Sequence, residues 1–122
     1  MERGDATILV VEDDGDIRLL LKAILEAEGY RVIEAATGKD AVSTSAELRP
    51  RLILMDISLP LLDGLSATRQ IKAEEQLKDV PVVAVSAYDT ARRRAIQAGC
   101  ADFVSKPIEV EKLKAVIERL LI

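Results

Sequence analysis

Short apolar runs alternate with amphipathic stretches five times along this chain of 122 residues, and this alternation limits the possible folds more than any other feature. An alternation of this kind predicts a parallel sheet with helices on both faces. Strands buried on both faces read as continuous apolar runs, as the runs do here. We expect strands at residues 8–11, 31–35, 52–55, 80–85 and 103–104.

The amphipathic stretches predict five helices. The first carries one apolar stripe and ends near Gly29, where a left-handed cap is favourable. We expect this stripe to be buried, with Leu19 on the opposite face; the stripe consists of Ile17, Leu20, Leu21, Ile24 and Leu25. Further helices are expected at residues 37–49, 64–73 and 90–98 and from residue 109 onward. In the fourth helix, the residues expected to face inward are Ala91, Ala95, Ile96 and Ala98.

Composition excludes several kinds of protein. The net charge of −4 argues against direct nucleic-acid binding, which needs a basic face larger than Arg92–Arg94. The chain has no histidine, which excludes a Ser-His-Asp triad, a histidine-bearing zinc site and a phosphohistidine carrier. Cys100 is the sole cysteine, and neither a signal-peptide pattern nor a membrane-length apolar run is present. We therefore expect a cytoplasmic protein that does not associate with membranes.

Polar side chains follow four of the expected strands. Their carboxyl ends meet at one edge of an open parallel sheet, where α/β proteins build their sites. We therefore expect these groups to converge. They are Glu12, Asp13 and Asp14 after the first strand, Asp56 after the third, Ser86 after the fourth, and Ser105 and Lys106 after the fifth.

These residue types suit phosphoryl chemistry. Clustered carboxylates repel one another unless a cation intervenes, and Mg²⁺ prefers oxygen ligands. Lys106 can neutralise phosphate charge, and Ser86 can donate a hydrogen bond to a phosphate oxygen. An aspartate between the metal and the lysine, such as Asp56, is a plausible nucleophile for phosphorus.

Each of these residues also has a purely structural interpretation. Asp14 is expected to serve mainly as the N-cap of the first helix. Taken singly, Ser86 is typical of a turn and Lys106 of a solvated surface. Their joint placement at the ends of the appropriate strands favours a functional site.

At this point the chain resembles the receiver domain of two-component response regulators. The resemblance rests on the order and spacing of four segments and covers essentially the whole chain. These segments are Ile8–Asp14, Leu54–Gly64, Val85–Ala87 and Gly99–Pro107. It implies a flavodoxin-like, single three-layer α/β domain over residues 1–122, with five helices and a five-stranded parallel sheet of order 2-1-3-4-5. In the absence of an output module, the chain is similar to single-domain, cell-cycle-type regulators and to receivers of hybrid kinases.

The resemblance also implies roles for the site residues. Asp56 would accept the phosphoryl group, which Ser86 and Lys106 would contact. Asp13 and Asp56 would bind Mg²⁺ directly, Glu12 mostly through water, and Ser58 through its backbone carbonyl. Phe103 would be the aromatic switch that responds to Ser86, and Lys106–Pro107 would be a cis peptide. The residues named in these roles are Glu12, Asp13, Asp56, Ser58, Ser86, Phe103 and Lys106.

The implied function is a signalling switch rather than a turnover enzyme. A histidine kinase or a histidine phosphotransfer protein would supply the phosphoryl group. A downstream effector protein would bind the surface formed by the fourth helix, fifth strand and fifth helix. Glu12, Ser86 and Phe103 stand where the family often has Asp, Thr and Tyr, and none of these changes removes an essential group.

Three alternatives remain open from the sequence. A haloacid-dehalogenase-like hydrolase also uses an aspartate nucleophile, but it usually has a second aspartate two residues later, where Ser58 stands. A degenerate receiver used only for protein interaction is opposed by the intact acids and Lys106. A flavodoxin-like cofactor binder would need a phosphate-binding loop where the acids follow the first strand. Incubation with Mg²⁺ and acetyl phosphate tests these interpretations. A stable mass gain on Asp56 supports the switch, steady phosphate release with turnover supports the hydrolase, and neither outcome supports the interaction module.

Overall fold

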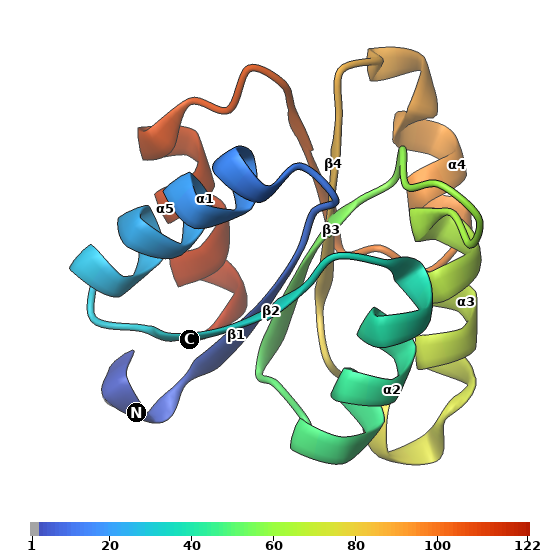
Figure 1. Ribbon diagram of the computed structural model, residues 1–122, viewed down its shortest axis with the longest axis horizontal. Helices are drawn as coiled ribbons and strands as arrows, with labels where there is room; N and C mark the ends of the chain where they lie inside the picture. Colours follow the sequence, from blue (N-terminus) through green and yellow to red (C-terminus); the bar gives the residue numbers. More distant parts are fainter. Residues whose placement is uncertain (1–2) are drawn as a thin grey trace.

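Five parallel strands form the sheet at the centre of this computed structural model, which describes residues 3–122 (Figure 1). Their order is β2-β1-β3-β4-β5, as expected. Each strand is four or five residues long. The strands are β1 (Thr7–Val11), β2 (Arg31–Ala35), β3 (Leu52–Asp56), β4 (Val82–Ser86) and β5 (Asp102–Ser105).

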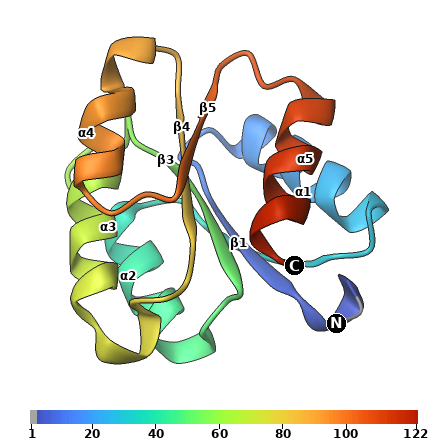
Figure 2. The ribbon, with the colours of Figure 1, turned by 180° about the vertical axis from the view of Figure 1, so that it is seen from behind.

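Helices cover both faces of this sheet. One face carries α1 and α5, and the other carries α2, α3 and α4, so the domain has three layers (Figures 1 and 2). The bounds are α1 (Gly15–Ala27), α2 (Gly38–Leu48), α3 (Gly64–Ala73), α4 (Arg92–Gln97) and α5 (Val110–Leu120), with short 3₁₀ turns at Arg3–Asp5, Glu75–Leu77 and Asp89–Ala91. Within residues 3–122, none of the helices combines the length and apolarity needed to cross a membrane.

The period-two geometry of the strands divides the core into two halves. In β1, Leu9 and Val11 pack toward α2, α3 and α4, whereas Ile8 and Val10 pack toward α1 and α5. Because successive side chains point to opposite faces, an entirely apolar strand supplies both halves. This is the physical reason that the central strands are continuous apolar runs.

Local signals set several helix ends. Asp14 accepts hydrogen bonds from the backbone N–H groups of Asp16 and Ile17, which confirms it as the N-cap of α1. Thr37 Oγ1 accepts from the Asp40 N–H at the start of α2. Gly29 follows α1 at a φ of 95°, a left-handed conformation that glycine adopts readily.

Four details of the sequence prediction are wrong. In α1 the expected buried stripe is incomplete: Leu21 and Leu25 are buried, but Ile17 is 36% exposed and Leu20 is 60% exposed. The fourth helix is shorter than expected, because residues 89–91 form a 3₁₀ turn before α4. Ile96 is half exposed rather than inward, since small alanines hold this helix close to the sheet. β4 begins at Val82, after Pro81, rather than at residue 80.

Candidate functional site

The carboxyl edge of the sheet gathers the polar side chains that follow the strands. Asp56 is the last residue of β3 and Ser86 the last of β4, while Glu12 directly follows β1 and Lys106 directly follows β5. Asp56, Ser86 and Glu12 are buried, with 1–3% of their surface exposed. Buried polar groups need partners, so the contacts among them define the site.

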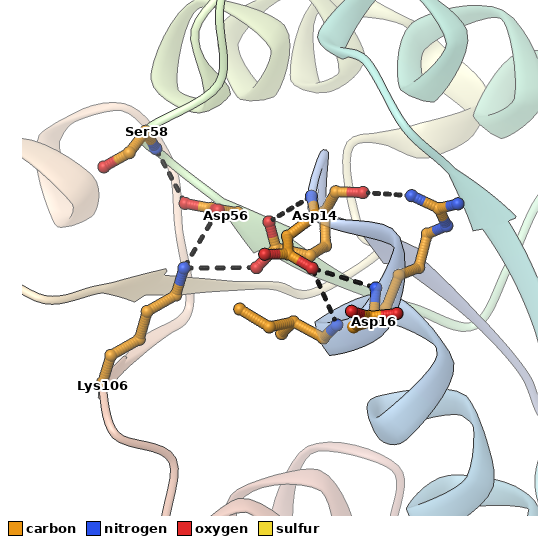
Figure 3. A network of polar contacts seen from close by, with 8 residues as sticks. Asp14, Asp16, Asp56, Ser58 and Lys106 are labelled. Carbon is orange, nitrogen blue, oxygen red and sulfur yellow. Dashed lines mark hydrogen bonds and ion pairs between the residues drawn. The ribbon is translucent and has the colours of Figure 1, made fainter.

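Lys106 joins two of the acids. Its Nζ lies 3.1 Å from Asp56 Oδ2 and 3.2 Å from Glu12 Oε1 (Figure 3). One ammonium group therefore holds two carboxylates that precede it in the chain by 50 positions (Asp56) and 94 positions (Glu12). This contact places a positive charge directly beside the Asp56 carboxylate.

The carboxylates themselves form a compact cluster. Glu12, Asp13 and Asp56 each offer an oxygen within 4.8 Å of the others, and Asp13 is exposed while the other two are buried. Burial, followed by the hydrogen-bonded Asp56, raises the pKa of Glu12 to about 7. Burial alone would lower the pKa of Lys106, but its contacts with Asp56 and Glu12 outweigh that and raise it.

Backbone N–H groups fix the orientation of the acids. Asp56 Oδ1 accepts a hydrogen bond of 2.8 Å from the Ser58 N–H. Glu12 Oε2 accepts one of 3.2 Å from the Asp14 N–H (Figure 3). Both buried carboxylates are thus held from the backbone on one oxygen and from Lys106 on the other.

A glycine allows the loop after β3 to fold back onto Asp56. A Cβ added to Gly64 would lie 2.3 Å from the Asp56 carbonyl oxygen and 2.5 Å from Ile57 Cα. Any larger residue would displace the backbone that carries Asp56. Gly64 also begins α3, which Asp63 caps by accepting from the N–H groups of Leu65 and Ser66. Asp63 and Gly64 together therefore hold the start of α3 against the backbone of Asp56.

The other side of the site connects to α4 and β5. Ser86 Oγ accepts a hydrogen bond of 3.0 Å from the Tyr88 N–H and keeps its own hydrogen for donation. Phe103 is buried, and the Arg92 guanidinium lies over its ring. Asp89 Oδ1 accepts a short hydrogen bond of 2.6 Å from Ser105 Oγ. The peptide bond between Lys106 and Pro107 is cis.

Sequence reasoning missed two residues beside the acids. Arg18 Nη1 donates a hydrogen bond of 2.8 Å to the carbonyl oxygen of Glu12, and its Nε donates to Glu34 Oε1 at 3.2 Å. Glu34 lies on β2, so the pairing depends on how β2 is placed beside β1. The available sequence signal was a basic residue one turn into the helix that follows the acids.

A doubly wound α/β domain with an acid cluster and a lysine at the carboxyl edge of its sheet has the architecture of a phosphoacceptor receiver. The sequence profile of the family described as response regulator receiver domain matches residues 8–118. The chain belongs to this family, whose members accept phosphoryl groups in two-component signalling.

Curated relatives and solved structures agree with this assignment. The polar-differentiation response regulator DivK of Brucella anthropi is 37% identical over 117 residues, which cover 94% of this chain and 95% of the relative. The receiver domain of a sensor histidine kinase from Pseudomonas aeruginosa, solved with magnesium in its active-site cleft, is 38% identical with a TM-score of 0.89 over 95% of this chain and 97% of its own. The receiver domain of NtrX from Brucella abortus is 37% identical with a TM-score of 0.86, covering 93% and 97% of the two chains.

Proposed function

We propose that this chain is a phosphorylation switch that accepts a phosphoryl group on Asp56, and that it is not a turnover enzyme. The observation that carries the proposal is the Asp56 carboxylate, buried at the end of β3 and held by Lys106 beside two further acids. Carboxylates gathered this closely repel one another unless a cation lies between them, so the cluster favours a function that uses cations.

The donor set fits a magnesium ion. The carboxylate oxygens of Glu12, Asp13 and Asp56 lie within 4.8 Å of one another, and hard oxygen ligands suit this cation. Asp13 and Asp56 would hold Mg²⁺ directly, Glu12 would act mostly through water, and Ser58 would contribute its backbone carbonyl. When bound, the ion would neutralise charge on the transferring phosphoryl group.

The protein side chains then have distinct tasks in the transfer. A carboxylate oxygen of Asp56 forms the new bond to phosphorus while the bond from phosphorus to the donor's imidazole nitrogen breaks, and that nitrogen keeps the electron pair. Lys106 moves its hydrogen bond from Asp56 to a phosphoryl oxygen. The Ser86 hydroxyl donates to another oxygen of the same group.

A histidine kinase or histidine phosphotransfer protein is the proposed donor. The chain contains no histidine, so a phosphohistidine has to come from a partner. An apolar groove of about 540 Å³ between α1 and the segment after β5 extends to Lys106, and Ile17, Leu20, Pro107 and Ile108 line it. These apolar side chains beside the site, of which Ile17 and Leu20 are exposed, suit a helix of the donor protein.

The proposed output is a downstream effector that reads the surface of α4, β5 and α5, with Ser86 and Phe103 as the switch pair. Contacts that cross from the site to this surface support it, since Asp89 binds Ser105 and Arg92 covers Phe103. The net charge of −4 favours a protein partner over direct nucleic-acid binding. A cytoplasmic location stays a prediction from the sequence.

The test is incubation with acetyl phosphate and Mg²⁺, followed by intact-mass measurement of wild type and Asp56→Asn. Wild type should gain the mass of one phosphoryl group, and Asp56→Asn should not. Steady release of phosphate without a stable adduct would favour a hydrolase instead. No labelling and no release would favour an interaction module.

A further inference from the structure

Arg18 contacts the acidic loop without belonging to the acid cluster. Its side chain, 22% exposed, leaves α1 and reaches back over the loop that joins β1 to α1. Nη1 donates to the Glu12 carbonyl oxygen at 2.8 Å, one of the contacts drawn in Figure 3. Nε donates to Glu34 on β2 at 3.2 Å. The guanidinium therefore ties the loop to the neighbouring strand.

The carbonyl that Arg18 holds belongs to the peptide between Glu12 and Asp13. The N–H of Glu12 donates to the Ala35 carbonyl oxygen at 3.1 Å, so both backbone polar groups of Glu12 are engaged. On the other side, Asp14 is fixed as the N-cap of α1. Asp13 thus lies between two anchored residues. The hydrogen bond from Arg18 fixes the orientation of the peptide plane that leads into the Cα atom of Asp13.

We propose that Arg18 is a positioning residue that sets the affinity of the acid cluster for a divalent cation. This inference rests on the proposed function, because it assumes that Glu12, Asp13 and Asp56 bind Mg²⁺. Outer groups that orient metal ligands commonly change metal affinity by about 10–100-fold when removed. Arg18 acts here on a backbone carbonyl, so it orients two acids through one peptide plane.

The geometry calls for arginine rather than any cation. The two hydrogen bonds leave different nitrogens of one planar group, toward a carbonyl on the loop and a carboxylate on β2. A lysine has one nitrogen on a flexible stem and cannot reproduce this fork. Pairing with Glu34 also offsets the positive charge of the guanidinium, which would otherwise oppose cation binding nearby.

Lys22 provides a matched control. It lies one turn further along α1 and pairs with the other oxygen of the same carboxylate, Glu34 Oε2, at 3.5 Å. Removing Lys22 therefore changes the charge around Glu34 by the same amount as removing Arg18. Arg18 binds the Glu12 carbonyl oxygen, whereas the hydrogen bond of Lys22 goes to Glu34. Comparing Arg18→Ala with Lys22→Ala therefore isolates the effect of the bond to the Glu12 carbonyl.

The experiment is a titration of the metal-free protein with MgCl₂, followed by backbone amide shifts in NMR spectra, for wild type, Arg18→Ala, Arg18→Lys and Lys22→Ala. Circular dichroism verifies that each variant is folded at the titration temperature. Arg18→Ala should weaken Mg²⁺ binding about tenfold. Arg18→Lys should recover part of this loss, and Lys22→Ala should bind as wild type does.

Each result decides the inference. An unchanged dissociation constant in Arg18→Ala, or an equal loss in Arg18→Ala and Lys22→Ala, overturns it. If Arg18→Ala does not fold, Arg18→Lys replaces it: weaker binding than Lys22→Ala supports the inference, and equal binding overturns it. Failure of wild type to bind Mg²⁺ would instead contradict the proposed function, so the two failures are distinguishable.

Discussion

The central carbon of the Arg92 guanidinium lies 4.7 Å from the centroid of the Phe103 ring. Arg92 begins α4 and Phe103 lies in β5, so this contact joins the two elements beside the site. The ring is already buried in this structure, with 4% of its surface exposed. In this state the cation on α4 covers an inward aromatic side chain.

Arg92→Ala should loosen Phe103. A cation over an aromatic face at an exposed site contributes about 0.5–1 kcal/mol, so the free energy of unfolding should fall by about that amount. Phe103 is the sole phenylalanine, and fluorophenylalanine labelling therefore gives one ring signal to follow by ¹⁹F NMR. The signal should broaden or divide in Arg92→Ala and remain as in wild type in the exposed control Arg93→Ala. Identical spectra in both variants would contradict a role for Arg92.

The stability of the metal-free protein should depend on Glu12. Its pKa rises from an ordinary 4.5 to about 7 in the folded state, mainly through burial. Between these values the folded protein binds more protons than the unfolded chain, so the free energy of unfolding falls as pH rises through this window. Urea unfolding at several pH values should show this slope in wild type and a smaller one in Glu12→Gln. Equal slopes in the two proteins would refute the assignment.

Lys106→Ala should separate metal binding from phosphoryl transfer. The ammonium group donates hydrogen bonds to one oxygen each of Asp56 and Glu12. Its removal frees these oxygens and takes away no carboxylate, so Mg²⁺ binding should remain intact. Transfer from acetyl phosphate should slow by about 10²-fold or more, the usual cost of removing a group that stabilises developing charge. Lys112→Ala, which removes an exposed ion pair with Glu109, is the control. Loss of Mg²⁺ binding, or unchanged transfer, would argue against this division of roles.

Leu20→Glu should impair transfer from a protein donor. Leu20 lines the groove that extends to Lys106, whereas Leu19, which is also exposed, is not among the residues that line it. A charge in an apolar interface should slow transfer from a phosphohistidine protein at least about fivefold, which corresponds to a contact worth more than 1 kcal/mol. Labelling by acetyl phosphate should be unaffected. Leu19→Glu serves as the matched control. If Leu20→Glu slowed phosphorylation equally from the phosphohistidine protein and from acetyl phosphate, the result would oppose docking at this groove.

Gly64→Ala should be strongly destabilising. The added methyl group would lie 2.3 Å from the Asp56 carbonyl oxygen, so the backbone has to move. Overpacking of this kind costs about 1–3 kcal/mol, which thermal unfolding measures directly. Labelling of Asp56 should slow as well, because the displaced backbone carries the acceptor. Gly4→Ala, where a Cβ would meet open space, should have little effect on either measurement.

The sequence alone determined the layers of this fold and the strand ends at which the polar groups lie. Continuous apolar runs at β1, β3 and β4 could be buried only between two helical layers. Because the strands are parallel, their carboxyl ends bring Glu12, Asp56 and Lys106 to one edge of the sheet. The topology alone therefore predicts that these three residues lie close together. Local chemistry likewise set Asp14 as a helix cap and Gly29 as a helix stop, because these depend on neighbours in the chain.

Tertiary structure decided the features that depend on which surfaces other elements leave uncovered. Ile17 and Leu20 have the spacing of core residues, yet the core beneath α1 is filled by Leu21 and Leu25, so the first two border an open groove. The partners of Arg18 and Arg92 depend on the placement of β2 and β5 beside other elements. Periodicity reports which side of a helix is apolar, but the packing of the whole domain decides how much of that side is covered.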